Sequence, residues 1–200
     1  MQHHPLRVGF DLDGVLLYNP TRTIRPFVSQ IKRVWFHKRK LKFYYPRTRV
    51  EKLLWMLAHK SSIYNAPGLT EISRLVQEGK IEAYLVTARF SFLGAGVERW
   101  VKRNHLDHTF AGVYHNAQDE QPHEFKERMI KELKLDVYVE DNFDIVNHLK
   151  SKTPTEIVWI YNLFDKHTPF PHKFPHLKSA LEYVMQRLNV RTLKRSYETK

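Results

Sequence analysis

Residues 6–15 read LRVGFDLDGV, an apolar run that leads directly into two aspartates and a glycine. The segment Leu6–Leu12 is typical of a buried β-strand, because it is short, mainly apolar and followed by a turn-forming residue. A strand that ends in Asp11 and Asp13 places two carboxylates where the chain leaves the sheet. This stretch therefore predicts both the first strand of the fold and the first part of a candidate site.

Four further segments have a strand-like composition: Ile81–Thr87, Phe110–Tyr114, Asp136–Glu140 and Glu156–Tyr161. Apolar residues at helical spacing indicate helices at Gly94–Asn104, Pro122–Leu133, Phe143–Leu149 and Leu177–Leu188. Alternating strands and helices predict an α/β fold with a mainly parallel, Rossmann-like sheet and helices on both of its faces.

One interval breaks this alternation. Between the first and second strands the chain reads as helices, roughly Arg25–His37, Thr48–His59 and Thr70–Glu78. A single crossover needs only about 10–12 residues, so the excess predicts a small helical cap inserted after the first strand. The expected division is a core at residues 1–18 and 80–190, a cap at 19–79, and a charged, frayed tail at 191–200.

The predicted cap is strongly basic. Residues 14–50 contain no Asp or Glu and hold the basic residues Arg22, Arg25, Lys32, Arg33, Lys38, Arg39, Lys40, Lys42, Arg47 and Arg49. The rest of the chain is close to neutral, although the formal net charge of the whole is +12. This segment favours anionic partners: a small phosphorylated substrate first, with nucleic acid or an anionic membrane surface as further candidates.

Composition also excludes several classes of protein. The chain has no cysteine, which excludes disulfides, thiolate metal sites and a cysteine nucleophile. No apolar run approaches the ~18–20 residues that span a bilayer, and the first residues lack the basic-then-apolar layout of a secretion signal. We therefore expect a cytoplasmic protein with no transmembrane segment.

Three predicted strands end in polar side chains. Open parallel sheets bind their ligands at the carboxyl ends of the strands, and these side chains should therefore meet: Asp11 and Asp13, then Thr87 and Arg89, then Glu140 and Asp141. Carboxylates gathered at one edge repel one another unless a cation lies between them. An oxygen-rich, cysteine-free set of ligands suits Mg²⁺.

These residue types fit phosphoryl transfer. With Mg²⁺ bound, a phosphate dianion can approach the carboxylates, and Asp11 is placed to attack phosphorus and form an aspartyl-phosphate. Asp13 is the candidate acid and base, while Thr87 and Arg89 are candidate phosphate contacts.

A cation for the phosphoryl oxygens is expected from the helix at residues 122–133. Lys126 is preferred over Lys131, since Lys131 lies roughly 7 Å farther along the helix from the edge of the sheet.

The order of these residues resembles the four motifs of the haloacid dehalogenase-like (HAD) hydrolases. The stretch from Asp11 to Val15 is similar to the first motif, Thr87 to the second, Lys126 to the third, and Glu140-Asp141 to the fourth. The resemblance covers nearly the whole predicted core. A narrower likeness, carried by residues 87–89 and 126–141, is to the 5′-(deoxy)nucleotidase-like branch.

The resemblance implies a Mg²⁺-dependent phosphomonoesterase, a hydrolase that works through an aspartyl-phosphate. Asp11 would be the nucleophile and a metal ligand, Asp13 the acid and base with its backbone carbonyl on the metal, and Asp141 the residue that completes the metal site. Glu140 departs from the family, because the paired-carboxylate form of the fourth motif usually has Asp there. Glu140 either binds the metal through its longer side chain or lies beside the metal site. Asp144 is a further candidate metal ligand in this loop.

Other functions stay open from the sequence. The substrate is a small metabolite, with nucleotides as one class, or a phosphorylated nucleic-acid end. A binding protein on a HAD scaffold is a further alternative, against which the presence of both Asp11 and Asp13 argues. Membrane association is another, since one helical stripe is apolar and bordered by cations: Ile24, Phe27, Val28, Ile31 and Trp35. The same stripe also fits a cap helix packed on its neighbours.

Overall fold

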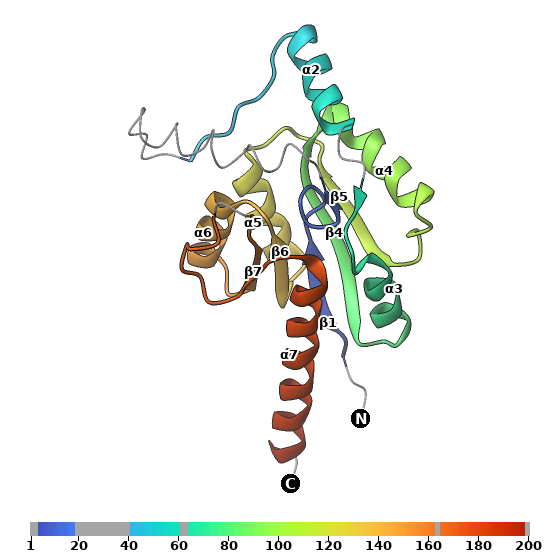
Figure 1. Cartoon of the computed structure of the whole chain (residues 1–200), viewed down its shortest axis with the longest axis vertical. Helices are drawn as coiled ribbons and strands as arrows, with labels where there is room; N and C mark the ends of the chain where they lie inside the picture. The colour runs from blue at the N-terminus through green and yellow to red at the C-terminus, as the bar shows by residue number, and fades with distance from the viewer. Residues whose placement is uncertain (1–3, 19–40, 61–63, 163–164, 199–200) are drawn as a thin grey trace.

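The computed structural model describes residues 4–18, 41–60, 64–162 and 165–198 of the chain. At its centre lies a six-stranded sheet in the order β5-β4-β1-β6-β7-β8 (Figure 1), in which every neighbouring pair is parallel. The strands are β1 (Leu6–Phe10), β4 (Ile81–Phe90), β5 (Phe110–Asn116), β6 (Val137–Glu140), β7 (Glu156–Ile160) and β8 (Lys173–Phe174). The predicted α/β, Rossmann-like fold is confirmed, and β8 is a strand that the sequence did not indicate.

Helices cover both faces of the sheet, because its central strands are apolar on both sides. One apolar cluster joins the sheet to α3 (Leu69–Gln77), α4 (Gly94–Arg103) and α7 (Leu177–Glu198). A second cluster joins the opposite face to α5 (Pro122–Glu132) and α6 (Phe143–Lys152). The central strand β1 contributes Leu6, Val8 and Phe10 to the first of these clusters.

Helix α7 is longer than expected. The sequence predicts its end at Leu188 and a frayed tail at residues 191–200, whereas the helix continues to Glu198. No glycine or proline interrupts residues 177–198, and residues with good helix propensity continue the periodic segment. The C-terminal end of α7 extends away from the sheet (Figure 1).

The insertion begins and ends at a two-stranded ribbon. β2 (Leu17–Tyr18) pairs antiparallel with β3 (Tyr64–Asn65), and Tyr18 lies opposite Tyr64. Among the described residues between them, helix α2 (Arg49–Lys60) lies farthest from the sheet (Figure 1). The chain therefore leaves the core and returns to it at one place.

The division into core and cap stays a prediction. The expected helix at residues 25–37, its apolar stripe and most of the basic segment lie outside the described residues; of the ten cations, only Lys42, Arg47 and Arg49 lie within them. Helix α3, placed in the cap by the sequence, contributes Ile72 and Leu75 to the core cluster.

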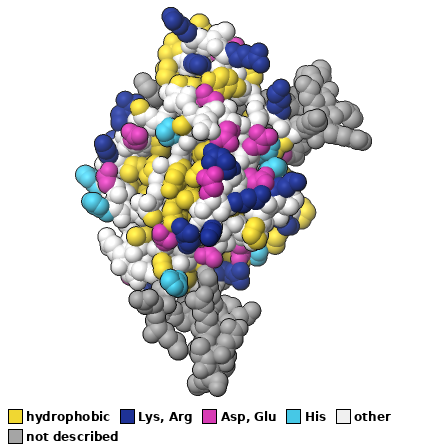
Figure 2. All heavy atoms as spheres, turned by 180° about the vertical axis from the view of Figure 1, so that it is seen from behind, with side chains coloured by type: hydrophobic (Ala, Val, Ile, Leu, Met, Phe, Trp, Pro, Cys, Tyr) yellow, Lys and Arg dark blue, Asp and Glu magenta, His cyan; other side chains and the backbone are white. Residues whose placement is uncertain are grey.

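Helix α2 carries an exposed apolar stripe. Its members are Val50, Leu53, Leu54 and Leu57, which are exposed and follow the spacing of one helical face. Figure 2 shows hydrophobic side chains gathered beside Lys and Arg at this end of the molecule.

Within the described residues, no helix is long and apolar enough to cross a membrane.

Candidate active site

The site lies at the carboxyl ends of three adjacent strands, β4, β1 and β6. The chain runs from β1 to β4 and β5 on one side of the sheet, and then crosses to β6 on the other side, so the strand order reverses at β1. Such a reversal leaves a crevice at the carboxyl ends of the strands. Asp11 follows β1 directly, and its backbone N–H donates to the carbonyl of Val139, 3.0 Å away.

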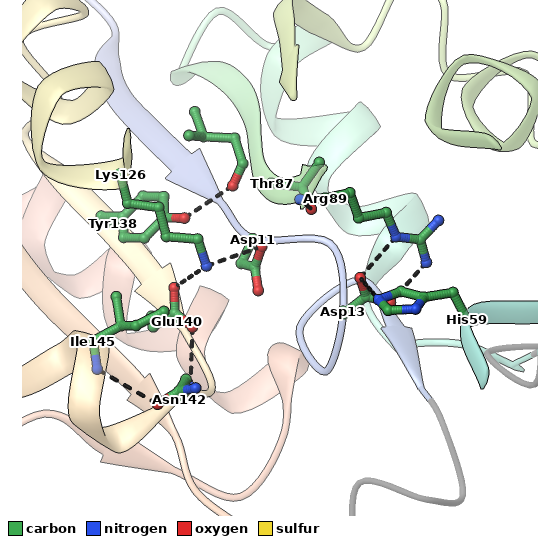
Figure 3. A network of polar contacts seen from close by, with 11 residues as sticks. Asp11, Asp13, His59, Thr87, Arg89, Lys126, Tyr138, Glu140, Asn142 and Ile145 are labelled. Atoms are coloured by element: carbon green, nitrogen blue, oxygen red, sulfur yellow. Dashed lines mark hydrogen bonds and ion pairs between the residues drawn. The ribbon is translucent and has the colours of Figure 1, made fainter. Parts of the chain in front are cut away.

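A buried lysine joins two of these strand ends (Figure 3). The Nζ atom of Lys126 lies 3.2 Å from Oδ1 of Asp11 and 2.5 Å from Oε2 of Glu140. Lys126 and Glu140 are 2% and 0% exposed, so water contributes little to stabilising their charges. The structure thus places Lys126 among the carboxylates, whereas Lys131 is half exposed and pairs with Glu127.

Burial and charge act against each other in this cluster. Burial raises the pKa of Asp11 well above its usual range, Lys126 opposes that shift, and Glu140 adds to it. Burial likewise raises the pKa of Glu140, against the pull of Lys126. Burial lowers the pKa of Lys126, but Asp11 and Glu140 raise it by more, so the net shift is upward. A further cation would favour the ionised form of both carboxyl groups.

Three carboxylates are close enough to hold such a cation. Ligand oxygens of Asp11, Glu140 and Asp141 lie within 4.8 Å of one another, and all three residues are buried. Oδ1 of Asp11 accepts no hydrogen bond from any described residue, although Lys126 is near it. Three buried carboxylates beside one ammonium group leave an excess of negative charge, which fits a divalent cation with hard oxygen ligands. Asp144, the spare candidate, lies outside this group.

Glu140 and Asp141 are fixed by the start of α6. The second carboxylate oxygen of Glu140, Oε1, accepts from the backbone N–H of Asn142 at 3.0 Å, so both of its oxygens have partners. The Asn142 side chain caps α6 by accepting from the backbone N–H of Asp144. The backbone carbonyl of Asp141 accepts from the Trp159 indole at 3.1 Å.

Gly14 leaves the space that the Asp141 carboxylate occupies. Its φ angle is +87°, and a Cβ atom added there would lie 2.2 Å from Oδ2 of Asp141. The turn is compact, since the Gly14 N–H donates to the carbonyl of Leu17 at 2.8 Å. Only glycine combines this backbone conformation with so close an approach.

We expect Gly14→Ala to reduce Mg²⁺ affinity by roughly 10-fold or more, because it displaces a carboxylate of the metal-candidate group. Gly79→Ala is the matched control: Gly79 also has a positive φ, +65°, but nothing lies within 4 Å of an added Cβ. Both variants should lose about 1–3 kcal/mol of stability from backbone strain. The measurement is the Mg²⁺-dependent rise in melting temperature, and an undiminished rise in Gly14→Ala would contradict a role for Asp141 in metal binding.

Asp13 faces away from the Lys126 cluster and toward Arg89 (Figure 3). The guanidinium group donates from Nε to Oδ2 and from Nη2 to Oδ1 of Asp13, each at 2.7 Å. The register of β4 with β5 shifts between Thr87 and Phe90, and such an irregularity re-aims side chains at the end of a strand. Arg89, which the sequence predicts as a phosphate contact, therefore contacts the predicted acid and base in this structure.

Thr87 lies at the same edge and is buried. Its Oγ1 atom accepts from the backbone N–H of Arg89 at 3.4 Å. From β6, on the far side of β1, the Tyr138 hydroxyl donates to the carbonyl of Val86 at 2.9 Å, and Lys126 lies over the Tyr138 ring, 5.9 Å from its centroid. These contacts join the ends of β4 and β6 to the lysine.

Sequence reasoning missed His59 as a neighbour of the site. Its Nε2 atom lies 4.0 Å from Oδ2 of Asp13, and its Nδ1 atom contacts the Trp55 carbonyl at 2.8 Å. His59 belongs to α2, so the insertion reaches the edge of the sheet. No signal in the sequence distinguishes this histidine from the other eleven.

Solved structures with a similar fold include hydrolases of the HAD superfamily. A HAD-superfamily hydrolase from Ehrlichia chaffeensis matches with a TM-score of 0.53 at 13% identity, over 93% of this chain and 98% of that one. CbbY from Rhodobacter sphaeroides, solved in complex with phosphate, matches with a TM-score of 0.54 at 14% identity, over 86% and 94%. The chain has the HAD fold.

A third solved structure agrees. A haloacid dehalogenase-like family hydrolase from Xanthomonas campestris matches with a TM-score of 0.54 at 14% identity, over 96% of this chain and 100% of that one. No protein-family model and no curated protein sequence matches the chain. At these identities the comparison defines the HAD fold, and the chemistry has to be argued from the site itself.

Proposed function

We propose that this protein is a Mg²⁺-dependent phosphomonoesterase that works through an aspartyl-phosphate on a small phosphorylated metabolite. The observation that carries the proposal is the buried cluster in which Lys126 lies between Asp11 and Glu140, with Asp141 beside them. Two observations support the proposal: the cluster lies at the carboxyl ends of the strands, where open parallel sheets bind ligands, and CbbY, a protein of similar fold, was solved in complex with phosphate. Nucleotides are one substrate class within the proposal.

Asp11 supplies the nucleophile in this mechanism. One of its carboxylate oxygens attacks phosphorus, the bond from phosphorus to the ester oxygen breaks, and the leaving oxygen takes a proton from Asp13. Asp13 then takes a proton from water, whose oxygen attacks the phosphorus of the aspartyl-phosphate. The bond between phosphorus and Asp11 breaks, which releases inorganic phosphate and restores both aspartates.

The other residues of the site stabilise charge. Lys126 and Thr87 are proposed to bind the phosphoryl oxygens as negative charge redistributes over them. Asp11, Asp141 and the backbone carbonyl of Asp13 are proposed to hold Mg²⁺, with Glu140 next to them and bonded to Lys126. When bound, Mg²⁺ supplies positive charge that lets a phosphate dianion approach the carboxylates.

The direct test is hydrolysis of an aryl phosphate with and without the metal. We expect turnover in Mg²⁺ or Mn²⁺, none after treatment with EDTA, recovery when Mg²⁺ is added back, and inhibition by Ca²⁺. Calcium is larger and takes more ligands, so it favours bidentate binding of the carboxylate that must attack. Full activity in EDTA after thorough dialysis would overturn the proposed site, and a screen of sugar phosphates, nucleotides and short oligonucleotides would identify the leaving group.

A further inference from the structure

We propose that Arg89 exchanges partners, from the Asp13 carboxylate to the phosphate of the ligand, so that Asp13 and the phosphate compete for one guanidinium group. The inference rests on the proposed function and adds a step to it that depends on ligand binding. It starts from the pair at the end of β4, in which one guanidinium group occupies both oxygens of Asp13.

Arg89 and Asp13 form a two-point contact. Two parallel N–H donors at 2.7 Å make a fork-to-fork contact, the strongest arrangement between arginine and a carboxylate. A carboxylate engaged in this way is an acceptor at both oxygens. An anion that takes the same two donors of Arg89 must therefore displace the Asp13 carboxylate.

An incoming phosphate supplies the competing acceptor. A phosphate dianion presents two coplanar oxygens to a guanidinium group as a carboxylate does, and it carries more charge. Arg89 is only 8% exposed, and its burial limits competition from water. Burial lowers the pKa of Arg89 and Asp13 raises it by more, so the net shift is upward and the group keeps its charge during the exchange.

The neighbouring cation is less suited to this exchange. Lys126 is fixed between Asp11 and Glu140 on the opposite side of the site. Arg89 follows Thr87 by two residues, across the irregular end of β4, so its side chain and the proposed phosphate donor start from the same strand end. Arg89 is thus a described cation in direct contact with the proposed acid and base, at the strand end that also carries the proposed phosphate donor.

A double-mutant cycle on phosphate binding tests the exchange without any need for turnover. Inorganic phosphate is titrated in Mg²⁺ buffer, by calorimetry, into the wild-type protein, Asp13→Asn, Arg89→Met and the double variant. Removing the competing carboxylate should tighten phosphate binding by about 5- to 20-fold in the Arg89 background, and by less than about 2-fold in the Arg89→Met background.

The matched control uses the other basic side chain near Asp13. In a His59→Gln background, Asp13→Asn should tighten phosphate binding by the same factor as in the wild-type background. Arg89→Lys provides a second test if Arg89→Met does not fold, because an ammonium group keeps the charge without the fork; the effect of Asp13→Asn should then be intermediate.

Two results would overturn the exchange. One is equal tightening in the Arg89 and Arg89→Met backgrounds, which would show only the loss of one negative charge near an anion. The other is no binding of phosphate to either the wild-type protein or Asp13→Asn. A different pair of results would contradict the proposed function alone. In that case the binding cycle would show coupling between Asp13 and Arg89, while the protein would hydrolyse no aryl phosphate in Mg²⁺.

Discussion

Asp11→Asn is expected to lower turnover of an aryl phosphate by at least about 10⁴-fold, the scale on which enzymes lose activity when a nucleophile is removed. An amide has no anionic oxygen with which to attack phosphorus, so the aspartyl-phosphate cannot form. The loss should lie in kcat, measured at saturating substrate and Mg²⁺. A variant with a near-wild-type rate and normal metal dependence would refute the covalent mechanism.

The same substitution should make the metal-free protein more stable at neutral pH. Burial raises the pKa of Asp11 above its unfolded value, so its ionisation disfavours the folded state increasingly as the pH rises above that unfolded value. The gain in melting temperature should therefore be larger at pH 7.5 than in acid. Lys126 retains Glu140 as a partner. Asp144→Asn is the control, since Asp144 is outside the cluster and should change neither rate nor stability greatly.

Lys126→Met is expected to have the largest effect on stability. It leaves Asp11 and Glu140 buried without the cation between them, a change that typically costs about 3–5 kcal/mol. The measurement is the free energy of unfolding in denaturant, in metal-free buffer. Turnover should also be lost, because the same ammonium group is proposed to bind the phosphoryl oxygens.

A second substitution should separate charge from packing in that variant. Adding Glu140→Gln to Lys126→Met removes one of the stranded charges and should restore part of the lost stability. Lys131→Met removes an exposed lysine that pairs with Glu127 and should cost less than about 1 kcal/mol. Equal losses in the two single lysine variants would contradict the buried cluster.

The sequence predicted the sheet and the main elements of the site for a physical reason. Short apolar runs such as residues 6–12 and 81–87 fit strands buried on both faces, and the carboxyl ends of parallel strands meet at one edge. The rise per residue of a helix was enough to prefer Lys126 to Lys131, and the structure places Lys126 beside the carboxylates. The roles of these residues stay predictions until the variants are measured.

Other features could not be read from the chain because they depend on contacts distant in sequence. Arg89 and its partner Asp13 are 76 residues apart in the sequence, so no local pattern encodes their contact. His59 lies near the C-terminal end of α2, and only the folded chain brings its Nε2 atom within 4.0 Å of Asp13. The charged residues at 191–198 were expected to be frayed, whereas α7 continues through them because they have good helix propensity.

The ribbon of β2 and β3 brings together the two ends of the segment that lies between these strands. Because Tyr18 lies opposite Tyr64, the chain leaves the large sheet and returns to it at neighbouring positions. We expect that exchanging the intervening segment for a different one, or for a two-residue hairpin turn, would leave the register of every strand in the large sheet unchanged. A chain built in this way would keep the chemistry of its strand ends while the exchanged segment alters which molecules reach them.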